Sequence, residues 1–339
     1  MPRQINLFLC HTPLHILISL LVAEHISPEE KIIFAIVEDS KNLHDFAQQL
    51  VNSRNIELLL LPGAASTQYL LKRALIHRAN AKFLHDTYAG IVSAVFIFHD
   101  LRAESQKLLN SDRALYGNIR FILLEDGVAL YEPGGLLVDG FFSILKRKIF
   151  WDIRWKHAPE LGHHPKLSEI QCFYPHLLKP SLRHLRAQPL PRIVPEIENS
   201  SLPGKLSLLH NNYCIIAVPH YIFGKDFISK FIDYSMRYCA SRQLIPVFKL
   251  HPRDQEAKSI ISTVIDSPAF IPQDIPIELL LFCMPGAVAL TGARTSALHI
   301  VNALHPNITC LYFDEDDNKG GSRWINFFAM MDIRPLISD

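Results

Sequence analysis

Two short segments in the second half of the chain carry residue types suited to holding a phosphate. Lys249-Leu250-His251-Pro252 ends the apolar run 245–250, and Thr295-Ser296 follow a later apolar run. A cationic or imidazole group at a strand end, with hydroxyls at a helix N-terminus, is suited to binding an anion. Because Pro252 ends strand pairing, Lys249 and His251 are expected at the carboxyl edge of a sheet. A surface His-Pro turn and an ordinary N-cap are the alternatives left open.

A pair of carboxylates ends an apolar run in the first half of the chain, where 121–124 is followed by Glu125-Asp126-Gly127. A carboxylate open to solvent can accept the proton of an attacking hydroxyl. Adjacent like charges raise one pKa, which favours a base that works near neutral pH. A plain Asp-Gly turn is the alternative. The phosphate site and the base indicate two domains that act on an activated phosphate donor.

The elements that position these residues alternate between strands and helices. The first half predicts strands at 5–10, 31–37, 56–61, 94–99 and 120–124, with helices at 13–24, 42–52 and 70–84. The second half predicts strands at 213–218, 245–250, 287–291 and 308–313, with helices at 226–241, 277–283 and 296–304. Such alternation predicts an α/β fold with parallel sheets covered by helices on both faces.

Prolines separate the two halves, with six of them between residues 175 and 203. Proline at this density breaks helices and strands, so it indicates an interdomain linker. We predict an N-terminal Rossmann-like acceptor domain over 1–185, a linker over about 186–204, and a C-terminal Rossmann-like donor domain over 205–339. Two such domains facing each other across a central cleft form the GT-B plan of glycosyltransferases.

The amino-acid composition argues against several classes of protein. Hydrophobic residues make up 49% and charged residues 20% of the 339 residues, which is typical of a folded protein. The formal net charge of +1 gives no global field for nucleic acid. Six cysteines lie singly, as buried thiols do in a reducing cytoplasm. No apolar run reaches the ~20 residues of a membrane span, so we expect a cytoplasmic protein.

Segment 141–157 mixes aromatic residues with five basic ones. This composition predicts either peripheral contact with an anionic membrane, at the inner face of the cytoplasmic membrane, or an interdomain helix with a solvated basic face.

The acidic pair with its glycine, the Lys-x-His-Pro strand end and the Thr-Ser pair together resemble the motif set of bacterial sialyltransferases. The chain is most similar to glycosyltransferase family 52, the lipooligosaccharide sialyltransferases, whose motifs are shared with family 80. Segments 8–14 and 275–298 also resemble family 52, so the resemblance covers both halves. The chain departs from the family pattern at two places. Glu125 stands where an aspartate is common, and the mixed pair Thr295-Ser296 stands where the family has two serines.

The resemblance implies a role for each matching residue. Asp126 matches the general base, and His251 matches the histidine that assists departure of cytidine monophosphate (CMP). The implied contacts of the donor are Lys249, Pro252, Glu278 at the ribose hydroxyls, Thr295, Ser296 and, more weakly, His220. The implied reaction is an inverting transfer of sialic acid from CMP-sialic acid to a galactose or GalNAc hydroxyl of a cell-surface glycan, a lipooligosaccharide or capsule.

The resemblance also implies that no metal and no other cofactor is needed, so the acidic run 314–317 is interpreted as a loop. Family members can dimerise, which makes a homodimer an expectation. Three alternatives stay open. The donor sugar can be another CMP-linked nonulosonate (legionaminic acid, pseudaminic acid or Kdo). The protein can be a CDP-polyol phosphotransferase of the teichoic type, or a nucleotide-binding module without catalysis. The sequence does not predict the acceptor or the linkage.

Overall fold

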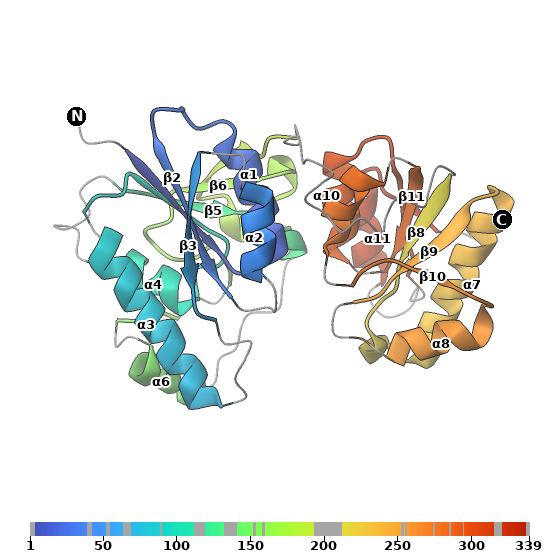
Figure 1. Cartoon of the computed structure of the whole chain (residues 1–339), viewed down its shortest axis with the longest axis horizontal. Helices are drawn as coiled ribbons and strands as arrows, with labels where there is room; N and C mark the ends of the chain where they lie inside the picture. The colour runs from blue at the N-terminus through green and yellow to red at the C-terminus, as the bar shows by residue number, and fades with distance from the viewer. Residues whose placement is uncertain are drawn as a thin grey trace. The chain divides into compact units, whose positions relative to one another are not determined.

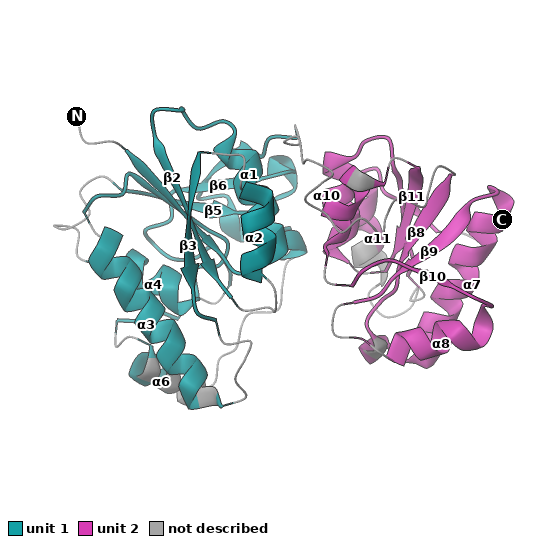
Figure 2. Ribbon diagram, in the orientation of Figure 1, with its two compact units in different colours: residues 1–196 teal, residues 197–339 magenta. Residues whose placement is uncertain are grey.

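The chain forms two compact units in the computed structural model, residues 1–196 and 197–339 (Figure 2). The structure describes residues 4–38, 43–51, 55–63, 69–88, 90–111, 119–131, 141–151, 154–157, 160–192, 212–251, 254, 256–273, 275–284, 286–293, 295–314 and 321–336.

The first unit is built on a parallel sheet of seven strands in the order β3-β2-β1-β4-β5-β6-β7. Its central strands are continuous apolar runs buried on both faces, as parallel sheets require. The strands are β1 (Ile5–Cys10), β2 (Lys31–Val37), β3 (Ile56–Leu61), β4 (Ala94–Ile97), β5 (Arg120–Leu124), β6 (Glu169–Cys172) and β7 (Arg186–Pro189).

Helices cover both faces of this sheet (Figure 1). One face carries α1 (Pro13–Ala23) and α2 (Leu43–Val51), and the other carries α3 (Leu70–Tyr88), α4 (Ala103–Leu109) and α6 (Phe141–Phe150). Short 3-10 turns are η1 (Gly127–Leu130), η2 (Pro175–Leu177) and η3 (Pro180–Leu182). The buried rings of Phe8 and Phe96 stack at 4.1 Å within the core.

The second unit repeats the plan with a parallel sheet of six strands in the order β10-β9-β8-β11-β12-β13. Its elements are β8 (Tyr213–Ala217), η6 (Tyr221–Phe223), α7 (Lys225–Ser241), β9 (Ile245–Lys249), α8 (Glu256–Val264), β10 (Ala269–Phe270), α9 (Ile277–Leu280), η7 (Leu281–Cys283), β11 (Ala287–Gly292), α10 (Ser296–Leu304), β12 (Thr309–Tyr312), α11 (Gly321–Ala329) and β13 (Arg334–Pro335). Helices α7 and α8 cover one face, and α10 and α11 cover the other (Figure 1).

The predicted α/β fold with two Rossmann-like units is therefore confirmed. One difference concerns the predicted linker: residues 186–189 form β7, paired in parallel with β6. Strand β7 lies at the sheet edge, where Pro189 is tolerated because one side of an edge strand needs no partner. Residues 193–211 lie outside the described part of the chain.

Five cysteines whose side chains the structure describes are buried free thiols, as predicted. Within the described ranges, no helix combines the length and the apolar character needed to cross a membrane.

Candidate active site

Each sheet has one place where the chain order reverses. Strand β1 lies between β2 and β4, and β8 lies between β9 and β11. The connections that leave the carboxyl ends of such neighbouring strands run to opposite faces of the sheet, and open α/β sheets bind their ligands there. Asp126 follows β5 in the first unit, and in the second unit the predicted site residues other than Glu278, which lies in α9, end or follow β8, β9 and β11, at or beside these two places.

In the first unit, the carboxylate of Asp126 accepts a hydrogen bond from a histidine that the sequence analysis did not select. His15 Nε2 lies 3.0 Å from Asp126 Oδ1. The His15 side chain is buried, whereas that of Asp126 is 31% exposed. Three adjacent strands thus contribute to one cluster: β1 leads to His15, β4 to Phe98 and His99, and β5 to Asp126.

The geometry fixes the tautomer of His15. Its Nδ1 accepts the backbone N–H of His11 at 3.1 Å, so the neutral ring carries its proton on Nε2 and donates it to Asp126. The ring also stacks on Phe98, with centroids 3.9 Å apart and planes 1° from parallel. Thr12 caps α1 by accepting from the backbone N–H of His15 at 3.2 Å. The segment after β1 therefore holds the imidazole in one orientation.

Glu125 points away from this cluster, into the core. Its carboxylate is fully buried and accepts from the Tyr131 hydroxyl at 2.5 Å and from the backbone N–H of Phe173 at 2.6 Å. Burial, and next the Glu125 charge, raise the pKa of Tyr131 well above its ordinary value, so this hydroxyl remains a donor. Glu125 therefore has a structural role, and Asp126 alone of the pair faces the candidate site.

The pKa of Asp126 is lowered, so the increase that adjacent like charges were expected to give one carboxylate of the pair is not found at Asp126. Burial opposes ionisation of Asp126, but the His15 hydrogen bond, and next the electrostatic influence of His15, His99 and Arg102, outweigh it. Burial lowers the pKa of His15 and of His99, against the opposing effect of Asp126 on both. The cluster at neutral pH is therefore a carboxylate next to neutral imidazoles. The increase is absent at Asp126 because Glu125, the expected source of like charge, faces the opposite way.

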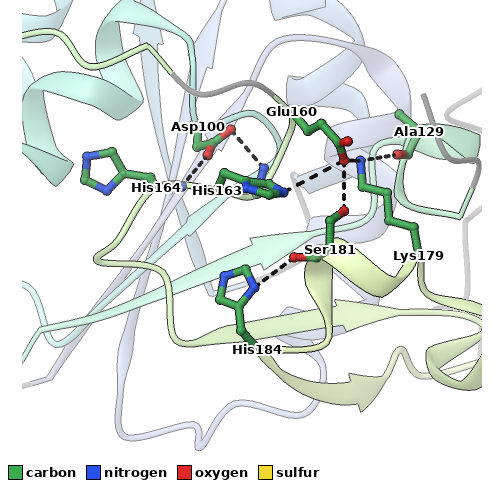
Figure 3. A network of polar contacts seen from close by, with 9 residues as sticks. Asp100, Ala129, Glu160, His163, His164, Lys179, Ser181 and His184 are labelled. Carbon is green, nitrogen blue, oxygen red and sulfur yellow. Dashed lines mark hydrogen bonds and ion pairs between the residues drawn. The ribbon is translucent and has the colours of Figure 1, made fainter. Parts of the chain in front are cut away.

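A polar network fastens the turn that follows Asp126 (Figure 3). The Lys179 ammonium pairs with Glu160 at 2.9 Å and donates to the carbonyl of Ala129, in η1, at 3.2 Å. The Ser181 hydroxyl donates to the same Glu160 oxygen at 2.8 Å. The hydrogen bond from Lys179 lowers the pKa of Glu160, which keeps this pair charged. Backbone conformation helps as well, because Gly127 has a φ of 74°, which suits glycine.

Asp100 forms the other part of the network in Figure 3. Its buried carboxylate accepts from the backbone N–H groups of Gly162, at 3.1 Å, and His164, at 3.0 Å. The connection that follows β4 is thereby joined to the segment that precedes β6. The backbone that carries His99 is fixed from this side.

In the second unit, the structure brings His251 and His220 together. Their rings meet edge to face with centroids 4.9 Å apart. His251 is exposed and His220 half-buried, and His220 Nδ1 accepts from the backbone N–H of Ile222 at 3.2 Å. The parallel register explains the pairing, because Ala217 at the end of β8 lies opposite Lys249 at the end of β9.

The remaining predicted donor contacts lie at the same edge of the sheet or close to it. Lys249 is buried and its ammonium donates to the carbonyl of Pro272. Glu278, in α9, is also buried, and burial raises its pKa against the opposing charges of His299 and Lys249. Pro252 lies outside the described residues.

Thr295 and Ser296 open α10, as predicted. Thr295 is the N-cap and accepts from the backbone N–H of Ala297 at 3.3 Å, which leaves its O–H able to donate. Both residues are half-buried. Gly292 permits the tight turn into α10, since a Cβ there would lie 2.8 Å from Thr295 Cγ2. The helix N-terminus therefore lies at the carboxyl end of β11, next to β8.

Sequence reasoning missed His15, His99 and Arg102. The sequence did contain a partial indication of His15, because this residue follows His11-Thr12-Pro13 at the end of a predicted strand. His99 ends the predicted strand 94–99 in the same way. Within the described ranges, no three or more His, Cys, Asp or Glu side chains are grouped so as to hold a metal ion. Residues 315–317 of the acidic run are not described.

Two parallel α/β units of this kind, with candidate sites at the carboxyl ends of their strands, define the GT-B class of fold. No protein-family model matches the sequence, and no curated protein matches it. Solved structures do match.

The chain is similar to the α/β-galactoside α-2,3-sialyltransferase from the luminous marine bacterium Photobacterium phosphoreum, with a TM-score of 0.58, 12% identity, and 99% of each chain covered. It is also similar to a 2,6-sialyltransferase from Photobacterium sp. JT-ISH-224, solved with the donor product CMP and the acceptor substrate lactose. There the TM-score is 0.53 and the identity 12%, with 99% of this chain and 79% of the other covered.

A third similar structure is MnaA of S. aureus with UDP, with a TM-score of 0.53, 10% identity, and 96% of this chain and 88% of the other covered. The predicted GT-B fold and the resemblance to bacterial sialyltransferases are confirmed at the level of the fold. Membership of family 52 in particular stays a prediction.

The buried carboxylate of Glu125 yields a stability prediction. Tyr131 Oη–H and Phe173 N–H both donate to Oε2 of Glu125, and Glu125→Gln replaces this charged acceptor with a neutral amide oxygen. We expect it to lower the free energy of unfolding by ~1–3 kcal/mol, measured by urea denaturation. The matched control is Glu57→Gln, which removes an exposed pair with Lys31 and should cost under ~1 kcal/mol. Equal effects of the two substitutions would contradict the structural role of Glu125.

Proposed function

We propose that the protein is an inverting sialyltransferase that moves sialic acid from CMP-sialic acid to a galactose or GalNAc hydroxyl of a cell-surface glycan. The observation that carries the proposal is the partly exposed Asp126 carboxylate, held by His15 at the carboxyl edge of a GT-B unit. The similar folds of two Photobacterium sialyltransferases support the same class of reaction.

In the proposed reaction, the acceptor hydroxyl attacks the anomeric carbon of the donor sugar. The acceptor O–H bond breaks and its proton goes to Asp126, while a new C–O bond forms. The bond between the anomeric carbon and the phosphate oxygen breaks, and CMP leaves with the bonding electrons. Because attack and departure occur on opposite faces of the carbon, the configuration inverts. His15 occupies Oδ1 of Asp126, so we assign the acceptor hydroxyl to Oδ2.

On the donor side, we assign the CMP phosphate to the edge formed by His251, His220 and the N-terminus of α10. An imidazole that donates a hydrogen bond stabilises the charge that gathers on the phosphate as it leaves. The Thr295 and Ser296 hydroxyls add donors at the positive end of the helix. We assign Lys249, Pro252 and Glu278 to the nucleoside, and the proposal includes no metal.

Two other reactions fit parts of this site. A different CMP-linked nonulosonate, such as legionaminic acid, pseudaminic acid or Kdo, would use the same nucleotide contacts. The His220–His251 pair also suits a CDP-polyol phosphotransferase, in which phosphate is transferred and stays in the product. A panel of CMP-sugar donors distinguishes the first alternative from transfer of sialic acid. The phosphorus content of the purified product distinguishes the second.

The first test of the mechanism exchanges one carboxylate for an amide. Asp126→Asn should lower kcat by ~10²–10⁴, because the amide cannot accept the proton. CMP release and glycoside formation are the readouts, and CMP affinity should stay unchanged, since Asp126 lies in the other unit from the donor residues. Glu125→Gln is the neighbouring control and should retain turnover wherever it is folded. Undiminished turnover by Asp126→Asn would refute the mechanism, and absence of turnover in the parent protein would favour a binding module.

A second prediction concerns the pH dependence of kcat/KM. His15→Phe keeps the stack on Phe98 but removes the hydrogen bond that lowers the pKa of Asp126. The pKa of Asp126 should then rise, so that the base is protonated, and activity is lost, at a higher pH on the acidic side. His15→Gln keeps an N–H donor and should move the acidic limb less. If both variants keep the acidic limb of the parent's pH profile, His15 does not determine the protonation of Asp126.

A third prediction concerns departure of the nucleotide. His251→Ala should lower kcat by ~10²–10³, because the charge on the leaving phosphate loses a donor. The effect should be smaller with a synthetic donor whose leaving group is a weaker base, measured under the same conditions. An equal loss with both donors would show that His251 does not act on the leaving group.

A further inference from the structure

Exposed apolar side chains are concentrated on one part of the first unit. Twelve large apolar residues are exposed in the described part of the chain, and half of them lie at 69–83 and 145–149. These six are Tyr69 (77% exposed), Leu71 (55%), Leu75 (51%), Phe83 (46%), Leu145 (41%) and Ile149 (59%). Single exposed apolar residues are normal, but a cluster of this kind indicates an interaction surface.

The cluster belongs to two helices that contact each other. Helix α6 lies beside α3 in Figure 1, and residues of the two are in contact. Leu71, Leu75, Arg78 and Lys82 follow one another at intervals of three or four residues, so they form one stripe on α3. On α6, Lys148 and Ile149 lie three and four residues after Leu145, so they share its face of the helix. We call these residues, with Tyr69 and Phe83, the α3–α6 surface.

Every charged residue between these apolar side chains is basic. Exposed Lys72, Arg73, Arg78 and Lys82 lie on α3, and exposed Lys148 lies on α6. Segments 69–83 and 145–149 contain no Asp or Glu. The whole chain has a formal net charge of only +1, so this surface is a local feature. A partner must therefore offer both apolar material and negative charge.

Trp155, one of the aromatic residues of segment 141–157, does not add to this surface. Trp155 is buried and its Nε1–H donates to the carbonyl of Leu101 at 3.3 Å. The Arg147 guanidinium lies over the Trp151 and Trp155 rings, 5.7 and 5.1 Å from their centroids. These residues anchor α6 to the body of the unit, so that Leu145, Lys148 and Ile149 are presented on a fixed helix.

We infer that the α3–α6 surface binds the surface of an anionic lipid bilayer. Shallow insertion of leucine, isoleucine and aromatic side chains, with lysine and arginine against lipid phosphates, is the arrangement of an interfacial helix. A second copy of the chain fits less well, because a symmetric contact would oppose basic residues to basic residues. Binding at this surface requires no turnover and goes beyond the proposed function.

The test is sedimentation of the full chain with lipid vesicles. The protein should bind vesicles of three parts phosphatidylcholine and one part phosphatidylglycerol, and bind poorly to phosphatidylcholine alone. High salt should weaken the binding, because the charges are exposed. Arg78→Ala and Lys82→Ala should each lower the partition coefficient by about 5-fold.

Apolar contact is tested with Leu75→Glu and Ile149→Glu, which should abolish binding while leaving the thermal melt unchanged. The matched control is Val264→Glu, at a still more exposed apolar position on α8 in the other unit, which should bind like the parent. Equal affinity for neutral and anionic vesicles, or equal loss in the control, would overturn the proposal. Self-association that Leu75→Glu abolishes, without vesicle binding by the parent, would assign the surface to a second copy instead.

Discussion

The hydrogen bond between His15 and Asp126 joins residues 111 positions apart in the chain, and it depends on the register of the parallel sheet. Strand β5 pairs Leu123 with Ile97 of β4, and Leu124 with Gln171 of β6. Because successive side chains alternate between faces, a slip of one residue would exchange Glu125 and Asp126. The register therefore decides which carboxylate enters the core and which faces the candidate site.

This constraint explains why the sequence predicted some features and missed others. The central strands and the N-terminus of α10 could be predicted because each is a local pattern: an apolar run, or a hydroxyl before a helix. Strand β7 was missed because an edge strand need not be apolar. The contact of His15 with Asp126 and the inward direction of Glu125 depend on tertiary partners, Tyr131 and Phe173, that no local pattern identifies. The same dependence on tertiary partners explains why the pKa of Asp126 is lowered and not raised.

A lowered pKa makes Asp126 a weaker base, yet it suits the proposed chemistry. In an oxocarbenium-like transition state, cleavage of the bond to the phosphate leads and loss of the acceptor proton follows. The carboxylate then contributes mainly as an oriented acceptor that remains ionised over a wide pH range. Burial alone would work against this, because it favours the neutral acid. The neutral His15 ring, fixed by the backbone of His11, offsets that effect without adding a competing positive charge.

The backbone of Leu101 links the α3–α6 surface to this cluster. Its carbonyl accepts from Trp155, which anchors α6, and its N–H donates to Nδ1 of His99 at 3.2 Å. Next to it, the buried Asp100 holds the segment before β6. The short connection after β4 therefore contacts both the segment that anchors α6 and the His99 imidazole near Asp126. These contacts are buried and directional. Packing within the first unit therefore holds the proposed bilayer-binding surface in a fixed position relative to Asp126.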